Sequence, residues 1–205
     1  MQRPTSIYLA SASPRRRELL RQLGVQFQIV SSPVNEDPLP AEAATDYVLR
    51  LAAAKARAGW EHLPPQRRAP VLGADTTVVL DGDLLGKPAD LRQAVDMLTR
   101  LSGRTHEVLT GIALRTAGAV RTRLSRSEVT FGRIDAAQAR AYWESGEPRD
   151  KAGGYAIQGL GARFVQHLSG SFSGVMGLPL YETAQLLEQA GVAAWDESAP
   201  ARRAT

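Results

Sequence analysis

The sequence contains no cysteine and is poor in histidine. The lack of cysteine excludes disulfide bonds, thiolate metal sites and cysteine nucleophiles. The three histidines, His62, His106 and His167, are scattered and lack the i, i+4 spacing of a helical zinc pair. We therefore interpret them as ordinary polar residues. Any bound metal should be a hard, oxygen-liganded cation, with Mg²⁺ as the first choice.

Long hydrophobic runs are also absent. No segment approaches the roughly 20 apolar residues of a membrane span, and the N-terminus lacks the apolar core of a secretory signal. We expect a cytoplasmic protein with no membrane partner. Its 205 residues, 43% hydrophobic and 22% charged, match ordinary globular proteins. We expect one α/β domain over residues 1–197 and a frayed C-terminal tail over 198–205.

The charge is moderately basic, with a net charge of +4 and a pI near 9.7. Such a balance favours anionic ligands. The sequence has no zinc finger, basic zipper or aromatic RNA-binding signature. Nucleic acid is therefore not favoured as a partner.

Periodicity predicts alternating strands and helices. The first unit is a strand over 6–10, then a helix over 14–23 with Ser13 as its N-cap and Gly24 as its terminator. Such alternation is typical of an α/β fold with a mixed twisted sheet, whose ligands lodge at strand ends. The later expected elements are a strand at 25–30, a helix at 45–58 ended by Gly59, a strand at 71–80 with a hairpin at 81–83, a helix at 90–101, strands at 105–114 and 120–131 with a bulge near Arg126, a helix at 135–143, a glycine-rich loop at 153–161, a strand at 163–168 and a helix at 179–190.

The run Ser11-Ala12-Ser13-Pro14-Arg15-Arg16 stands where the first predicted helix begins. A helix N-terminus offers unpaired amide donors, and guanidinium groups grip phosphate oxygens through paired hydrogen bonds. The run therefore indicates an anion site that suits a triphosphate. The alternative is a well-capped surface helix with solvated arginines.

Asp75 is a carboxylate inside the otherwise apolar strand Gly73-Ala74-Asp75-Thr76-Thr77-Val78-Val79-Leu80. An unpaired buried carboxylate is strongly unfavourable. Asp75 should therefore pair with a cation, hold a metal, or keep a raised pKa suited to deprotonating water. The alternative is an aspartate at a strand end with local turn contacts.

Gly86-Lys87-Pro88 follows the predicted hairpin. Glycine permits close approach of the backbone and proline stiffens the loop, so that Lys87 is held where it can neutralise phosphate charge. A plain turn is the alternative for this tripeptide.

A glycine-rich segment, 150–161, surrounds Tyr155 and Gln158 with four glycines. Such a loop can mould itself to a nucleobase. Gln158 carries both a donor and an acceptor, as a pyrimidine imide edge requires. Tyr155 either contacts the ligand or only packs. A flexible connection with a structural glutamine is the alternative.

These motifs resemble the Maf family in order and spacing, over about residues 6–190. The resemblance implies an α/β fold of the Maf/ITPase-like type, with a mixed twisted β-sheet, flanking helices and two lobes around a central cleft. It also implies a nucleoside triphosphate pyrophosphatase that cuts between the α and β phosphates. The segments that carry the resemblance are Leu9–Arg16, Gly73–Thr76, Gly86–Pro88, Lys151–Gly159 and Gly177–Leu180.

Carried over by position, the resemblance implies a role for each candidate residue. Asp75 matches the general base and, with Glu36, the carboxylates that hold a divalent cation, Mg²⁺ or else Mn²⁺. Such chemistry needs a metal and cationic charge, and little covalent participation by the protein. The groups that match phosphate and substrate binding are Ser13, Arg16, Lys55 and Lys87.

The pattern of Arg15, Thr76 and Gln158 resembles the branch of the family that prefers dTTP and UTP. The branch that prefers methylated guanine usually has a glutamate in place of Gln158. A carboxamide complements the alternating acceptor and donor of uracil or thymine, which favours a pyrimidine. The segment 170–176 departs from many relatives, because Phe172 and Gly174 replace tyrosine and asparagine.

The resemblance leaves a second hypothesis open. The chain could be a non-catalytic regulator of cell division that binds nucleotides or nucleic acid. For the enzyme, the resemblance implies a role in cell-division arrest, or in keeping non-standard nucleotides out of nucleic acids, and a homodimer.

Overall fold

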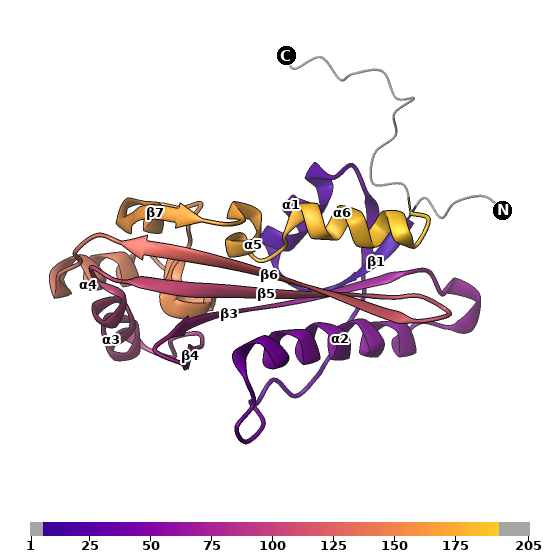
Figure 1. The fold of residues 1–205 in the computed structure, drawn as a ribbon, viewed down its shortest axis with the longest axis horizontal. Coiled ribbons are helices and arrows are strands. Elements are labelled where there is room, and N and C mark those ends of the chain that lie inside the picture. Colours follow the sequence, from indigo (N-terminus) through magenta and orange to yellow (C-terminus); the bar gives the residue numbers. More distant parts are fainter. Residues whose placement is uncertain (1–5, 193–205) are drawn as a thin grey trace, which may run out of the picture.

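A computed structural model describes residues 6–192 of the chain (Figure 1). The predicted tail, 198–205, lies outside the described residues. The single domain expected over residues 1–197 stays a prediction, because its last residues are not described.

Residues 6–192 form a seven-stranded mixed sheet in the order β2-β1-β3-β5-β6-β7, with β4 paired to β3. Strand β1 runs parallel to both of its neighbours, β2 and β3. The remaining pairs are antiparallel. The predicted α/β class with a mixed sheet is therefore confirmed. The strands are β1 (Ser6–Ala10), β2 (Gln26–Ile29), β3 (Val71–Leu80), β4 (Asp83–Leu85), β5 (Thr105–Arg115), β6 (Val120–Phe131) and β7 (Val165–Ser169).

Helices cover both faces of the sheet. Helix α2 lies along one face and α6 along the other, while α3 and α4 flank the far end of the long strands (Figure 1). Within residues 6–192, none of the helices combines the length and apolar character that a membrane crossing requires. The helices are α1 (Pro14–Gln22), α2 (Ala44–His62), α3 (Leu91–Leu101), α4 (Ala136–Glu144), α5 (Phe172–Met176) and α6 (Leu180–Gln189).

Two hydrophobic clusters divide the molecule into two lobes along the same long strands. One cluster joins β1, α1 and α6 to the residues around Leu72 of β3. The other joins α3 and α4 to the residues around Val78, further along the same strand. Asp75, Thr76 and Thr77 occupy the stretch of β3 between them, so these polar side chains lie where the two lobes meet.

Helix α2 packs directly on the sheet because the sheet has glycines beneath it. A Cβ atom on Gly73 would lie 2.3 Å from the carbonyl oxygen of Ala52, and one on Gly111 would lie 2.5 Å from that of Val48. Real Cβ atoms do not approach a backbone oxygen so closely. These two glycines therefore set how closely α2 approaches the sheet. That distance in turn determines which atoms of β3 the side chains of α2 can contact.

The prediction that the second helix ends at Gly59 is wrong, since α2 continues to His62. Gly59 is buried in the helix. A Cβ atom there would lie 2.8 Å from Cγ1 of Val30 and 3.0 Å from Cγ1 of Val71. Gly59 thus allows close packing of the helix on the sheet, although glycine has a low helix propensity.

The bulge predicted near Arg126 is also wrong, because β5 and β6 keep one continuous register past that residue. The apparent change of phase arises because Ser125 and Ser127 are buried in positions where an apolar residue was expected. The register shift lies instead in the β6–β7 pairing, between Thr130 and Phe131.

Two local boundaries differ from prediction near the C-terminal end. The strand expected from residue 163 begins at Val165, because the 3₁₀ turn Leu160–Phe164 precedes it. The short helix α5 was not predicted. Ser171 caps it by accepting a hydrogen bond from the amide of Gly174.

His106 is a buried core residue, with 2% of its surface exposed. Its Nε2 lies 2.8 Å from the hydroxyl of Tyr155, and its ring meets Phe131 edge-on. Its Nδ1 has no hydrogen-bond partner among the described residues. Burial lowers the pKa of His106 to about 4.

The neutral form of His106 is therefore favoured by folding, and the stability of the protein should depend on pH. Neutral His106 contributes fully to the stability of the folded state above the pKa of an unfolded histidine, 6.5. This contribution is lost as pH falls from that value toward about 4. The expected loss in the free energy of unfolding is about 3 kcal/mol. Urea unfolding at several pH values measures it.

A His106→Gln variant should show a much weaker pH dependence between pH 6.5 and 4, because the titrating group is gone. The exposed His167 provides the matched control, since His167→Gln should keep the wild-type slope. A His106→Gln variant with the wild-type slope would mean that other groups cause the dependence.

Candidate active site

One cavity of about 660 Å³ opens where the two lobes meet. It is lined by residues of β1, α1, α2 and β3, and by the loops before α3 and β7. Both lobes thus contribute to one shared hollow, and widely separated segments of the sequence converge there. All of the candidate residues proposed from the sequence line this cavity: Ser13, Arg15, Arg16, Glu36, Lys55, Asp75, Thr76, Lys87 and Gln158.

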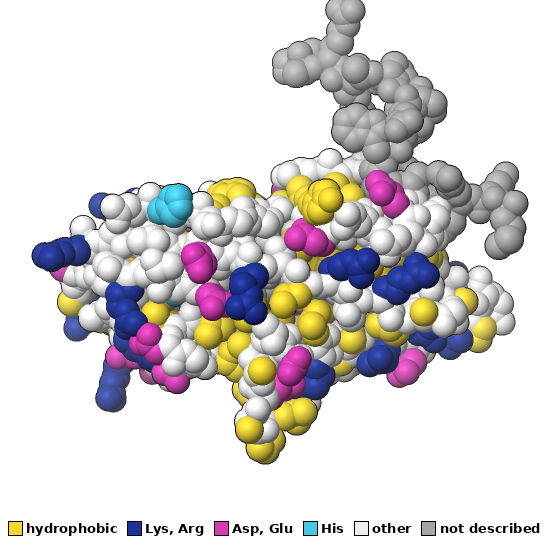
Figure 2. Space-filling view, in the orientation of Figure 1, with side chains coloured by type: hydrophobic (Ala, Val, Ile, Leu, Met, Phe, Trp, Pro, Cys, Tyr) yellow, Lys and Arg dark blue, Asp and Glu magenta, His cyan; other side chains and the backbone are white. Residues whose placement is uncertain are grey.

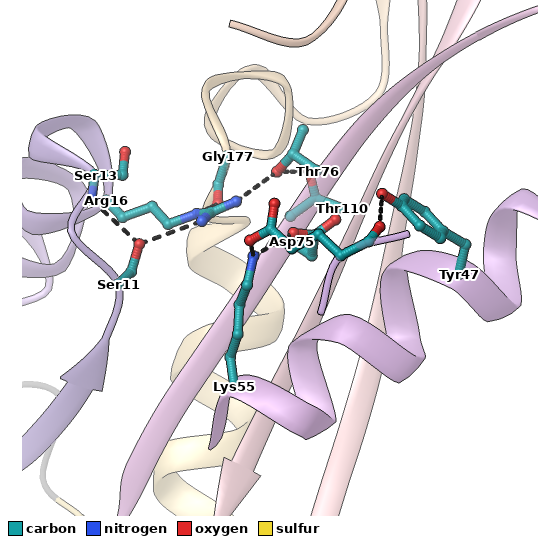
Figure 3. Close-up of polar contacts among 10 residues, drawn as sticks. Ser11, Ser13, Arg16, Tyr47, Lys55, Asp75, Thr76, Thr110 and Gly177 are labelled. Carbon is teal, nitrogen blue, oxygen red and sulfur yellow. Dashed lines mark hydrogen bonds and ion pairs between the residues drawn. The ribbon is translucent and has the colours of Figure 1, made fainter. Parts of the chain in front are cut away.

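Arg16 extends from the first turn of α1 across the cavity wall (Figure 3). Its Nε donates to the carbonyl of Gly177 at 2.7 Å, and its Nη2 donates to Oγ1 of Thr76 at 3.0 Å. A third, longer bond of 3.3 Å joins Nη1 to Oγ of Ser11. Arginine has five N–H donors, so two remain available to a ligand within the described structure.

The environment of Arg16 suits an anion. Burial lowers the pKa of Arg16, the carboxylates of Asp75 and Glu36 act in the opposite direction, and the neighbouring Arg15 adds to the lowering. An arginine nevertheless stays charged at neutral pH. A cation removed from water attracts a phosphate more strongly than a solvated one does. The guanidinium of Arg16 is therefore held in place in an environment that suits phosphate binding.

Lys55 reaches up from α2 and lies between two carboxylates (Figure 3). Its Nζ is 2.7 Å from Oδ1 of Asp75 and 2.6 Å from Oε1 of Glu36. The side chains of Lys55 and Asp75 are each 11% exposed, whereas that of Glu36 is 50% exposed. Of the alternatives considered for Asp75, pairing with a cation is the one observed.

Burial would raise the pKa of Glu36, but the hydrogen bond and charge of Lys55 more than offset it, with help from Lys87 and Arg16. The net result is a lowered pKa, so Glu36 is a carboxylate at neutral pH. Three cations thus act on this one acid from different elements, which indicates a site where charges of both signs gather.

Glu36 lies on the segment 30–43, which projects below α2 and carries apolar side chains on its outer surface (Figures 1 and 2). Two residues near the start of α2 hold this segment. The hydroxyl of Tyr47 donates to the carbonyl of Glu36 at 2.9 Å, and Nη2 of Arg50 donates to the carbonyl of Asp37 at 3.1 Å. The backbone of this acid is therefore fixed even though its side chain is half exposed.

Ser13 occupies the N-cap position of α1, as predicted, but its side chain makes no capping hydrogen bond. Its hydroxyl is therefore available to a ligand in the cavity. Nη1 of Arg15 lies 3.8 Å from Oδ2 of Asp150, in a long and weak ion pair that joins α1 to the opposite lobe.

Lys87 and Gln158 line the cavity from exposed loops. Neither side chain is engaged in an ion pair or side-chain hydrogen bond with any residue between 6 and 192. Tyr155 also lines the cavity, but only 6% of its surface is exposed, and its hydroxyl lies 2.8 Å from Nε2 of His106. Gln158 is exposed and presents its carboxamide from the same loop.

Two residues of the site had no role of their own in the sequence analysis, although Ser11 stands in the candidate run 11–16. Ser11 accepts hydrogen bonds from Arg16 and from the amide of Ser13. Thr110 of β5 lies opposite Thr76 in register, shares a 2.9 Å hydrogen bond with it, and also bonds the carbonyl of Gly174. The sequence places both threonines in predicted strands. It does not reveal the register that sets them opposite each other.

In the segment 170–176, the structure shows why position 174 suits a glycine. A Cβ atom on Gly174 would lie 2.9 Å from Oγ of Ser125 and 3.1 Å from Cβ of Ser171. Gly174 therefore fits closely over β6. Phe172 is half exposed and lies outside the described cavity wall.

Comparisons with known proteins identify the family of this chain. The family described as Maf-like protein matches residues 6–190. A protein of Alkalilimnicola ehrlichii named dTTP/UTP pyrophosphatase is 54% identical, with 89% of this chain and 92% of that protein covered. One of the same name from Aromatoleum aromaticum is 51% identical, with 90% of this chain and 95% of that protein covered.

Among solved structures, the Ham1 protein of Staphylococcus aureus matches with a TM-score of 0.41 and 13% identity, over 64% of this chain and 72% of that chain. The family match spans almost the whole described region, and both relatives are about half identical over nearly their full lengths. The chain therefore belongs to the family of Maf-like proteins.

Proposed function

We propose that this chain hydrolyses dTTP and UTP to the nucleoside monophosphate and pyrophosphate. The observation that carries the proposal is the convergence of two carboxylates and several cations on one cavity, contributed by both lobes. Relatives that are about half identical over most of their length bear the name dTTP/UTP pyrophosphatase. The name and the arrangement of charges support the same chemistry.

Asp75 is the general base of the proposed reaction. Within the described residues, its side-chain hydrogen bond comes from Lys55 and reaches only Oδ1. The second oxygen, Oδ2, is left to accept a proton from water. That water forms a bond to the α-phosphorus as the bond from this phosphorus to the bridging oxygen breaks, and pyrophosphate leaves.

The cations hold the phosphates. Within residues 6–192, three donors of Arg16 are bonded and two stay available, and Lys87, on a loop that contains Pro88, forms no ion pair. Lys55 orients Asp75 and adds a positive charge at the same wall. Catalysis of phosphoryl transfer comes almost entirely from positioning and from charge held in place before the reaction.

The donor set fits a divalent cation, Mg²⁺ or Mn²⁺. Glu36 and Asp75 already share a cation, the ammonium of Lys55, so the field at this point favours positive charge. Within residues 6–192, no cluster of three acidic or histidine side chains could hold an ion alone. Magnesium sites of this kind use one or two carboxylates and substrate phosphates. When bound, the ion supplies charge neutralisation at the phosphates.

Gln158 faces the base in the proposed complex, and Arg15 and Thr76 complete the pattern of the pyrimidine branch. Thr76 acts through Arg16, to which it is hydrogen-bonded. Arg15 lines the cavity and pairs with Asp150 at 3.8 Å. A carboxamide complements the donor and acceptor of uracil or thymine, which supports a pyrimidine nucleotide as the substrate.

Release of pyrophosphate from a panel of nucleotides tests the proposal. The panel contains dTTP, UTP, CTP, GTP and a methylated GTP, each with Mg²⁺ and with EDTA. We expect turnover of dTTP and UTP only with the metal, and a higher kcat/KM for UTP than for methylated GTP. Nucleotide binding without release of pyrophosphate would reject the enzyme and favour a regulator that only binds nucleotides.

The cytoplasmic location and the homodimer stay predictions. So do the implied roles in cell-division arrest and in excluding non-standard nucleotides.

A further inference from the structure

Glu147 ties the segment that bears Gln158 to the rest of its lobe. Its Oε1 accepts hydrogen bonds from the hydroxyl of Tyr142 at 2.6 Å and from the amide of Gly161 at 2.9 Å. Its Oε2 accepts a hydrogen bond from the amide of Leu160 at 2.9 Å. One carboxylate thus satisfies two backbone donors that lie two and three residues after Gln158.

Tyr142, on α4, holds the other side of the same segment. Its hydroxyl oxygen accepts a hydrogen bond from the buried amide of Ala156 at 3.0 Å, while it donates its proton to Glu147. The Tyr142–Glu147 pair therefore fastens the backbone on both sides of Ile157, Gln158 and Gly159. Ile157 and Gln158 both line the cavity, and of the two Gln158 is the exposed polar side chain.

The glycines of this segment admit the two polar side chains. A Cβ atom on Gly159 would lie 2.1 Å from Oε2 of Glu147, and one on Gly161 would lie 2.6 Å from the hydroxyl of Tyr142. The sequence suggested that glycines let the loop mould itself to a base. In the structure, these two permit close contact with the clamp, so the loop is held rather than free.

Glu147 is suited to this task because it stays charged. Burial would raise the pKa of Glu147, but the hydrogen bonds from Tyr142, Gly161 and Leu160 and the charge of Lys151 more than offset it and lower the pKa. Hydrogen bonds to a carboxylate are about twice as strong as neutral ones. Tyr142 and Glu147 both lie outside the set of described residues that line the cavity, so neither touches the nucleotide there.

We propose that Glu147, with Tyr142, is a positioning residue that sets the place of Gln158 and thereby the selectivity for pyrimidine over purine nucleotides. The inference rests on the proposed function, in which Gln158 faces the base. In this proposal, a purine, which is larger by a fused ring, meets Gln158 only if this segment shifts. A clamp that holds the backbone on both sides of Gln158 opposes that shift.

A Glu147→Gln variant tests the proposal. The amide group would place a donor against the amide of Leu160 or Gly161, so that at least one bond of the clamp is lost. We expect the ratio of kcat/KM for UTP to that for GTP to fall by about tenfold, mainly because KM for UTP rises. The kcat for UTP should stay near the wild-type value, because Asp75, Arg16 and Lys55 stand on other elements.

Glu144→Gln is the matched control, because Glu144 is an exposed acid on α4 and loses the same charge. It should keep the wild-type ratio. A Glu147→Asp variant retains the charge with a shorter arm and should recover part of the selectivity. It also gives a second test if Glu147→Gln does not fold, since the wild-type ratio in Glu147→Asp would then overturn the clamp.

A Gln158→Ala variant separates the two claims. If it loses selectivity while Glu147→Gln keeps the wild-type ratio, the clamp is refuted and the proposed function stands. The clamp is equally refuted if Glu147→Gln lowers kcat for every nucleotide by the same factor, because that result indicates general damage. If the wild-type protein releases no pyrophosphate from any nucleotide, the proposed function fails, and the inference fails with it.

Discussion

An Asp75→Asn variant is expected to lose about three orders of magnitude in kcat for UTP, within the range that removal of a general base produces. Asparagine has nearly the same shape, and its oxygen can still accept the hydrogen bond from Lys55 that Asp75 accepts at 2.7 Å. The fold should therefore persist. The loss reflects the missing proton acceptor, and measurement of pyrophosphate release at saturating UTP checks it.

Two controls distinguish loss of the general base from loss of any carboxylate and from loss of a metal ligand. Asp83→Asn removes a carboxylate from an exposed ion pair of 2.6 Å with Arg100, outside the cavity, and should leave turnover unchanged. Titration with Mg²⁺ then separates the two roles proposed for Asp75. If excess Mg²⁺ restores the rate, the residue serves only to hold the ion. Wild-type turnover in Asp75→Asn would remove Asp75 from the mechanism altogether.

The residues of the site differ in how far the sequence alone could identify them. Asp75 was conspicuous, because a carboxylate within an apolar strand needs a partner. Arg15 and Arg16 were also conspicuous, because they begin a helix after a serine-rich turn. Glu36 and Lys55 were singled out only by resemblance. Neither belongs to a local pattern, and Lys55 meets Asp75 only because α2 docks on the sheet.

That docking depends on glycines whose purpose is not visible in the sequence. Gly73 and Gly111 allow the backbone of α2 to approach β3 and β5, and Gly59 was misread as the end of a helix. A glycine in a helical pattern is a terminator or a packing contact according to what lies opposite. The answer depends on the tertiary arrangement, as does the register that pairs Thr76 with Thr110.

The packing of α2 makes Lys55 the residue whose loss should most disturb the unliganded site. A Lys55→Met variant retains an unbranched side chain but leaves Asp75 and Glu36 facing each other without their shared cation. Removal of one partner from a buried ion pair costs several kcal/mol, because the other charge stays buried. We expect the free energy of unfolding in EDTA to fall by about 3 kcal/mol, as measured by urea titration.

Added Mg²⁺ should then stabilise Lys55→Met more than it stabilises the wild-type protein. In the wild type, an ion must compete with the ammonium that lies 2.6 Å and 2.7 Å from the two acids, and in the variant it meets them unpaired. Arg57→Met is the control, because it removes a positive charge from an exposed position of the same helix and should change stability by no more than about 0.5 kcal/mol. A Lys55→Met protein as stable as the wild type, with no added response to Mg²⁺, would show that the two carboxylates do not depend on this lysine and do not share a cation site.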